Sequence, residues 1–288
     1  MTILQIGVGL FILGLAVLRP FLYKPVAEKY EASFSSVFFC LWMILGILVS
    51  FVFMGEELLL LKEIIKNNSF AFWGGVLKGA FVWAAVLTSQ VINKKSVSSS
   101  VFFPFISLSL ASIVLNLFLG ENLEIVHLIS IILLGVLGGV FLVFGDAKRM
   151  SLNEKGMFWL AVFFTSGCSV CDHIGIKGMG WYLYLVVSNV VMFLFVLIKG
   201  ISKEDIKAVF GKKEVVKAGF FTLCYESVII ASMIAVMPVS IASFFMRLSA
   251  PVVMIFSAIK FREQTVKNQL IFGGLAIILA LPMMFVAK

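Results

Sequence analysis

The sequence predicts an all-α membrane protein with ten transmembrane helices arranged as two inverted five-helix repeats. Three observations lead to this fold class: the composition, ten apolar runs of spanning length, and a similarity between the two halves. Of the 288 residues, 61% are hydrophobic and 13% are charged, whereas a soluble domain is roughly half apolar and a quarter charged. Because a soluble core could not bury this much apolar surface, the expected surroundings are a lipid bilayer.

The apolar runs justify the helices one by one, since a spanning helix needs about 20 mainly apolar residues. Such runs occur at residues 3–22, 34–54, 70–92, 98–118, 125–145, 156–176, 180–199, 216–236, 239–259 and 265–287. Two connections, 55–68 and 199–217, place apolar and charged residues at helical spacing, and we expect both to lie in the membrane interface. The remaining connections are short, so no water-soluble domain is predicted.

The distribution of Lys and Arg predicts an orientation, because cytoplasmic connections are enriched in both. Seventeen of these residues fall in connections after odd-numbered helices and three, Lys62, Lys66 and Lys177, fall after even-numbered ones. This distribution predicts that the odd-numbered connections face the cytoplasm and that both termini lie outside. The same rule explains the net charge of +8 without a nucleic-acid partner.

The two halves can be aligned at an offset of 142 residues. Residues 97–123 then match 239–265 without a gap, and the matches include two serines and the pair Glu121 and Glu263. Five helices per half force the halves into opposite orientations. Inverted repeats of this kind are typical of secondary transporters, which bind substrate near the midplane between the repeats. The sequence therefore predicts two five-helix domains, 1–146 and 147–288.

In each half, the fourth helix runs into a short loop with a glutamate, in "FLGENL" and "KFREQT", followed by a fifth helix rich in small residues. This pattern resembles the drug/metabolite transporter (DMT) superfamily, and its EamA-like family most closely. The resemblance implies uniport, exchange or proton-coupled transport of small metabolites. It also implies that the third, fourth, eighth and ninth helices form much of the central cavity, and that both termini are cytoplasmic, which is the opposite of the orientation that the charges predict.

Charged residues inside predicted spans are the candidate site residues, because a charge within the membrane is costly and usually functional. Lys78, Glu226 and Arg247 lie within the third, eighth and ninth spans. A rise of about 1.5 Å per residue places all three near the middle of the bilayer. Two interpretations remain open. Glu226 and Arg247 form a structural ion pair and Lys78 has no partner, or the three residues line a cavity that receives a carboxylate or phosphate.

Three further residues are weaker candidates for substrate binding. Trp83 and Tyr225 occupy equivalent positions at the 142-residue offset and are each interpreted either as a cavity wall or as packing. Asp172 lies late in the sixth span, where we expect it to face a vestibule that attracts substrate. It follows Cys168 and Cys171, whose C-x-x-C spacing raises the question of a metal or redox site. No second Cys/His pair completes a tetrahedral zinc site, so no metal and no cofactor are predicted.

These observations predict a secondary transporter of a small organic metabolite, amino-acid-like or an organic anion, that works by alternating access in the cell (inner) membrane. It is not expected to be an enzyme, and no P-loop is present to use nucleotide energy. The alternatives are a lipid-headgroup flippase and a membrane-embedded enzyme that acts on a lipid-linked substrate. The expected partners are a small-molecule substrate and the bilayer. The G-x-x-x-G pair Gly75 and Gly79 allows close helix packing within one chain or in a homodimer.

Overall fold

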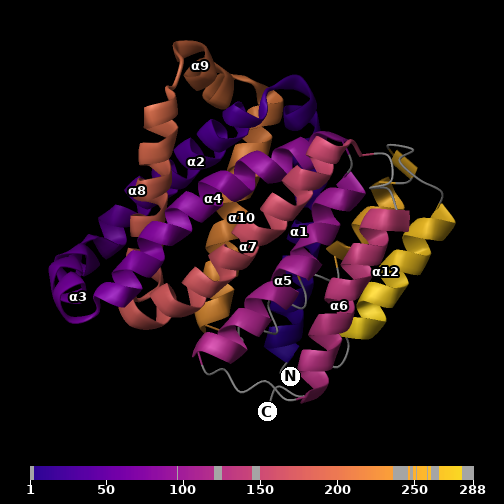
Figure 1. Cartoon of the computed structure of the whole chain (residues 1–288). Coiled ribbons are helices and arrows are strands. Elements are labelled where there is room, and N and C mark those ends of the chain that lie inside the picture. Colours follow the sequence, from indigo (N-terminus) through magenta and orange to yellow (C-terminus); the bar gives the residue numbers. More distant parts are fainter. Residues whose placement is uncertain are drawn as a thin grey trace.

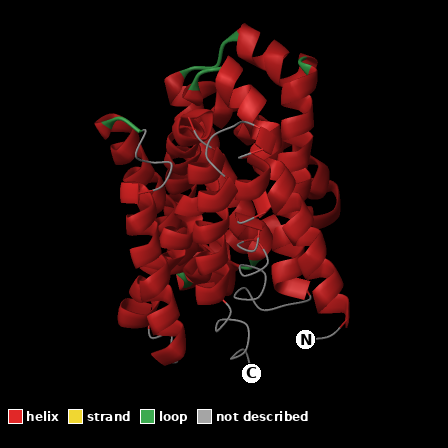
Figure 2. Ribbon diagram, turned by 90° about the vertical axis from the view of Figure 1, so that its right-hand side faces the viewer, coloured by secondary structure: helices red, strands yellow, loops and turns green. Residues whose placement is uncertain are grey.

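The computed structural model describes residues 3–95, 97–119, 125–144, 150–235, 246, 249–250, 252–257, 259–260 and 266–280. Over these ranges the chain is helical, with short turns and no strand. The helices pack side by side as a bundle (Figure 1), and several of the described turns lie at its ends (Figure 2).

The boundaries of the helices are close to the predicted ones. In chain order the elements are α1 (Ile3–Lys29), α2 (Ala32–Met54), the 3-10 helix η1 (Gly55–Leu60), α3 (Leu61–Asn67), α4 (Ser69–Lys95), α5 (Val97–Leu119), α6 (Ile125–Phe144), α7 (Leu152–Met179), α8 (Trp181–Lys199), α9 (Lys203–Gly211), α10 (Lys213–Ala235) and α12 (Val266–Ala280). Of the predicted span 239–259, residues 246, 249–250, 252–257 and 259 are described, and they are helical. Both predicted interfacial connections contain short helices, η1 with α3 and α9.

Five of these helices are long and apolar enough to cross a membrane: α1, α2, α4, α7 and α8. The outer surface of the bundle is also apolar. Val52, Phe53 and Ile198, for example, are 78%, 84% and 83% exposed. A soluble monomer rarely leaves so many large apolar side chains uncovered, whereas lipid chains would cover them. The prediction of an all-α membrane protein is thereby confirmed, while spanning by the other helices stays a prediction.

The antiparallel pair α4 and α7 forms the most extensive contact among the described helices. Asn68, next to the start of α4, donates its side-chain amide to the carbonyl oxygen of Gly178 near the end of α7, at 3.4 Å. Residues near the start of α4 are therefore level with residues near the end of α7. This pairing positions Lys78 and Asp172 opposite each other.

Helix α8 returns along α4 after a tight turn at Gly180. This glycine has a φ of 76°, which L-residues with a side chain rarely adopt. Gly75 and Gly79 on α4 then allow α8 to approach closely. A Cβ on Gly75 would contact Met179 and Val187, and a Cβ on Gly79 would overlap the main-chain oxygen of Ser188. In this chain the G-x-x-x-G pair therefore serves intramolecular packing.

Substitution of Gly79 should separate α4 from α8. We expect Gly79→Ala to lower the free energy of unfolding by about 1–3 kcal/mol, because the methyl group overlaps backbone that cannot rotate away. The matched control is Gly14→Ala on α1, where a Cβ would meet no atom within 4 Å. The measurement is thermal unfolding of the purified protein in detergent. Equal melting temperatures for the two variants would contradict the proposed close approach.

Candidate functional site

A cavity of about 420 Å³ lies inside the bundle, among α1, α2, α4, α5, α7, α8 and α10. Each helix contributes one face to the wall. On α4 the lining residues include Lys78, Val82, Ala85 and Ser89, and on α7 they include Asp172. Their spacing of three or four residues is that of a single helical face. The volume is in the range of pockets that bind small organic molecules.

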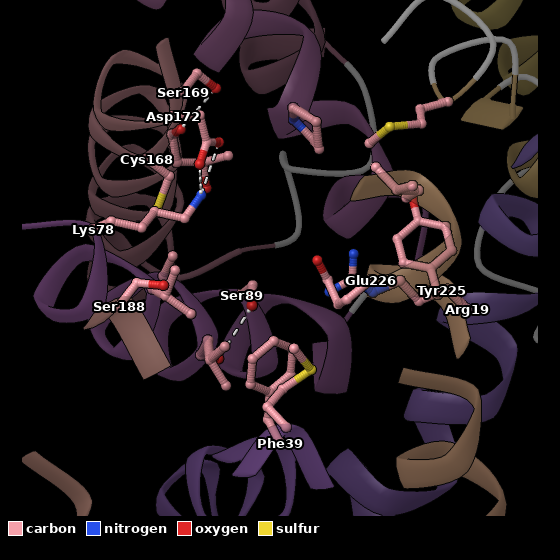
Figure 3. A pocket seen from close by; sticks show the side chains of 18 of the residues that line it. Arg19, Phe39, Lys78, Ser89, Cys168, Ser169, Asp172, Ser188, Tyr225 and Glu226 are labelled. Carbon is pink, nitrogen blue, oxygen red and sulfur yellow. Dashed lines mark hydrogen bonds and ion pairs between the residues drawn. The ribbon is translucent and has the colours of Figure 1, made fainter. Parts of the chain in front are cut away.

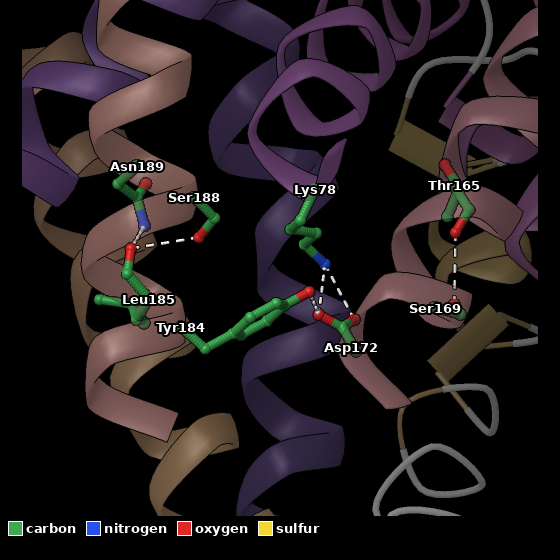
Figure 4. Close-up of polar contacts among 8 residues, drawn as sticks. All are labelled: Lys78, Thr165, Ser169, Asp172, Tyr184, Leu185, Ser188 and Asn189. Carbon is green, nitrogen blue, oxygen red and sulfur yellow. Dashed lines mark hydrogen bonds and ion pairs between the residues drawn. The ribbon is translucent and has the colours of Figure 1, made fainter. Parts of the chain in front are cut away.

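One wall of the cavity carries an ion pair between α4 and α7. The ammonium nitrogen of Lys78 lies 2.8 Å from Oδ1 of Asp172 and donates a hydrogen bond of 2.8 Å to Oδ2. The hydroxyl of Tyr184 on α8 donates to Oδ1 of the same carboxylate, also at 2.8 Å. Figure 4 shows the three side chains meeting at Asp172. Three helices are thus joined through one carboxylate.

Asp172 lies further from the end of its helix than the predicted span implied. The predicted span ended at residue 176, which placed Asp172 near a mouth, but α7 continues to Met179. Two features set these bounds. Ser151 and Glu154 form a capping box at the start of the helix, and Gly180 ends it. Asp172 consequently lies about one turn further in, at the level of Lys78.

A second ion pair joins α1 to α10. A guanidinium nitrogen of Arg19 lies 3.6 Å from Oε1 of Glu226. The guanidinium carbon is also 5.0 Å from the ring centre of Tyr225 and 5.4 Å from that of Tyr23, close enough for cation–π attraction. Figure 3 shows this group on the opposite side of the cavity from Lys78 and Asp172.

Arg19 was not among the sequence candidates, although it contacts Glu226. It was counted with the charges of the first connection, because it lies close to the end of the predicted span 3–22. In the structure Pro20 and Pro25 lie inside α1, which runs on to Lys29, so Arg19 lies well within a membrane helix. The length of the apolar segment on both sides of Arg19 was the signal that could have identified it.

Four of the six predicted site residues line this one cavity: Lys78, Asp172, Tyr225 and Glu226. Trp83 does not line it. Its indole ring stacks on Phe195, with 5.2 Å between ring centres, and packs against the core. Arg247 lies outside the described residues. Its role in binding stays a prediction, as do those of the other five.

The C-x-x-C of α7 is part of the packing and of the cavity wall. Cys168 and Cys171 are buried free thiols, and Cys168 also lines the cavity. His173, which follows Asp172, lies with its Nε2 atom 3.0 Å from the ammonium of Lys177. Among the described residues, no three His, Cys, Asp or Glu side chains form a group that could hold a metal ion.

Uncharged polar side chains complete the wall. Ser89, Ser188 and Asn189 donate to main-chain oxygens of their own helices, so their hydroxyl and carbonyl oxygens remain as acceptors. The Oε1 atom of Gln90 is buried, and no hydrogen-bond partner is described for it. A buried acceptor of this kind is normally satisfied by water or by a ligand, so the cavity offers acceptor sites for N–H or O–H groups.

Fold and cavity together define an all-helical membrane protein with a polar, charged interior site. The charged side chains described on the cavity wall are Arg19, Lys78, Asp172 and Glu226, two of each sign. No model of a known protein family matches the sequence, and no curated protein matches it significantly. Function must therefore be inferred from the site.

The hydrogen bond from Tyr184 to Asp172 can be tested against a neighbour on the same helix. We expect Tyr184→Phe to lower the free energy of unfolding by about 1.5–3 kcal/mol, the usual worth of a hydrogen bond to a charged group. Tyr182→Phe should change it by less than about 0.5 kcal/mol, because the Tyr182 hydroxyl is buried without a described partner. Thermal unfolding in detergent measures both, and a larger loss for Tyr182→Phe would refute the assignment.

Proposed function

We propose that this protein is a secondary transporter that moves a small organic metabolite, amino-acid-like or an organic anion, across the membrane by alternating access. The observation that carries the proposal is the charged cavity enclosed by apolar, membrane-length helices. Charges inside a membrane protein usually mark a substrate or ion pathway. A packed structural core would leave no space of about 420 Å³ beside them.

The proposed architecture has ten transmembrane helices in two inverted repeats, 1–146 and 147–288, as in EamA-like members of the DMT superfamily. Two features support it. Helices α5, α6, α10 and α12 overlap four more of the predicted spans. The cavity wall is also shared between the repeats, with α1, α2, α4 and α5 from the first and α7, α8 and α10 from the second. A site between inverted repeats is the usual arrangement in secondary transporters.

Both ion pairs cross from one proposed repeat to the other. Lys78 is in the first repeat and Asp172 in the second, and likewise Arg19 is in the first and Glu226 in the second. A substrate that competes for these charges weakens the contact between the repeats on the side it entered. In alternating access the protein opens to one side of the membrane or to the other. Because the substrate interacts differently with these two states, it can shift the equilibrium between them.

The driving force in this proposal is a solute gradient, used by uniport, exchange or proton coupling. A membrane carboxylate is the natural proton carrier, since its charged form is disfavoured away from water. Glu226 has a cation within 4 Å, so protonation of its carboxylate would release Arg19. Release of that kind would connect proton binding to movement of the helices.

Filling the cavity tests the proposal. Ala85 lines the cavity from α4, whereas Leu77 on the same helix is 50% exposed on the outer surface. We expect Ala85→Phe to reduce substrate counterflow in proteoliposomes at least tenfold, because its ring occupies the binding space, and Leu77→Phe to leave it unchanged. The labelled substrate is the strongest hit from a thermal-shift screen of amino acids, organic acids, sugars, nucleotides and quaternary amines.

Two outcomes would contradict transport through this cavity. One is a ligand that stabilises the wild-type protein yet shows no counterflow. The other is full counterflow by Ala85→Phe with a melting temperature equal to that of wild type, because transport would then follow another route.

A further inference from the structure

The two ion pairs of the cavity are built differently. Lys78 and Asp172 are in hydrogen-bond contact at 2.8 Å, and Tyr184 adds a further bond to the carboxylate. A guanidinium nitrogen of Arg19 and Oε1 of Glu226 are 3.6 Å apart, which is beyond a hydrogen bond. The first pair is hydrogen-bonded and supported by a third helix, while the second is not hydrogen-bonded and its side chains are 33% and 26% exposed, so a ligand in the cavity can reach both.

Arg19 is held in place by more than its acidic partner. The rings of Tyr225 and Tyr23 lie 5.0 and 5.4 Å from the guanidinium carbon. Tyr225 stacks in turn on Phe221, and Tyr23 packs edge-on against Phe38. Because these rings are fixed by packing, the guanidinium keeps its position when Glu226 turns to another cation. A planar guanidinium in a fixed position is well suited to bind a carboxylate through two hydrogen bonds.

We propose that Arg19 and Glu226 form the receptor for a zwitterionic head group, in which Arg19 binds the carboxylate of the substrate and Glu226 binds its ammonium. Lys78, Asp172 and Tyr184 stay together and hold α4, α7 and α8 in position. This inference rests on the proposed transport function and narrows its substrate to amino acids and related dipolar molecules. It also assigns a binding role to Arg19.

Charge balance favours a dipolar ligand over a singly charged one. In the free protein Arg19 and Glu226 compensate each other. An anion that binds Arg19 would leave Glu226 without a partner, and a cation that binds Glu226 would leave Arg19 without one. An uncompensated charge in a low-dielectric interior is costly. A zwitterion replaces one protein ion pair with two protein–ligand contacts and leaves the net charge of the site unchanged.

The rest of the ligand would meet an apolar surface. Phe38, Phe39 and Met43 of α2, Ile229 of α10, and Met246 also line the cavity. Phe39 lies below the two charged groups in the view of Figure 3. Aromatic and methionine side chains adapt to apolar groups of different shape. The site therefore fits a zwitterion with an apolar side chain better than a sugar or a nucleotide.

Three probes with the same ring and different charges test this inference. They are phenylalanine, 3-phenylpropanoate and 2-phenylethylamine, measured by isothermal titration calorimetry on the purified full-length protein at neutral pH. We expect phenylalanine to bind at least tenfold more tightly than either singly charged analogue, because only phenylalanine satisfies both Arg19 and Glu226. Equal or tighter binding of an analogue would overturn the inference, and so would the absence of binding by phenylalanine and leucine at millimolar concentration.

Single substitutions should change the preferred charge of the ligand. In Glu226→Gln the remaining cation favours the carboxylate, so 3-phenylpropanoate should bind at least as well as phenylalanine. In Arg19→Gln the remaining anion favours the amine, so 2-phenylethylamine should bind at least as well as phenylalanine. A structural ion pair would lose stability in both variants without this reversal. If Arg19→Gln does not fold, Glu226→Gln alone tests the roles of Arg19 and Glu226. A folded Glu226→Gln protein that keeps the wild-type order of the three affinities overturns the assignment.

A surface ion pair between the same two helices supplies the matched control. Lys29 on α1 lies 2.6 Å from Glu214 on α10, and their side chains are 54% and 34% exposed. Neither residue lines the cavity. Lys29→Gln and Glu214→Gln should leave the order of the three affinities unchanged. A reversal in these variants would mean that the effect arises from the α1–α10 contact in general, and this too would overturn the assignment.

Counterflow measurements distinguish failure of the zwitterion receptor from failure of the proposed transport function. Binding of phenylalanine with the expected reversals, but without counterflow of phenylalanine in proteoliposomes, would support the receptor and refute transport. Counterflow of an organic anion combined with failure of the zwitterion to bind would support transport and refute the receptor.

Discussion

The free energy needed to keep a charge away from water is the constraint on which the rest of this structure depends. Each of the charges described on the cavity wall has an opposite charge within 4 Å on another helix. In a medium of low dielectric constant an unpaired side chain of this type would be neutralised or would draw in water. The positions of α1, α4, α7, α8 and α10 relative to one another are therefore set by charge pairing as well as by apolar packing.

The signs of these charges are divided between the two halves of the chain. Arg19 and Lys78 precede residue 147, whereas Asp172 and Glu226 follow it. The two halves therefore attract each other across the cavity, and a ligand that enters must replace part of that attraction. The division also shows that the halves differ chemically even where their sequences can be aligned. At the 142-residue offset each of these four charged residues corresponds to an uncharged residue in the other half.

Most helix boundaries could be predicted from the sequence, because the length of an apolar run follows directly from the thickness of the bilayer. Charged residues inside the runs were equally visible, and Lys78, Asp172 and Glu226 do line one cavity. Their partners could not be derived, because pairing depends on which helices become neighbours. Lys78 had no predicted partner, and Arg19 was counted with the first connection because it lies near the end of the predicted span. Trp83 and Tyr225 are equivalent in the alignment but have different surroundings, since the ring of Trp83 stacks on Phe195 while that of Tyr225 faces Arg19.

In the transport cycle that we propose, the same constraint connects ligand choice with the closing of the site. A carrier that alternates must pass through a closed state in which the site is cut off from water on both sides, and every charge in it must then be compensated. The empty site meets this condition, because its own ion pairs are intact. A site loaded with a zwitterion meets it as well, because each protein charge has a ligand partner. A site that holds a singly charged ligand does not, unless a proton or a second ion enters with the ligand. In the proposed carrier, pairing across the cavity would therefore select the ligand and, by the same physics, determine which loaded states can close.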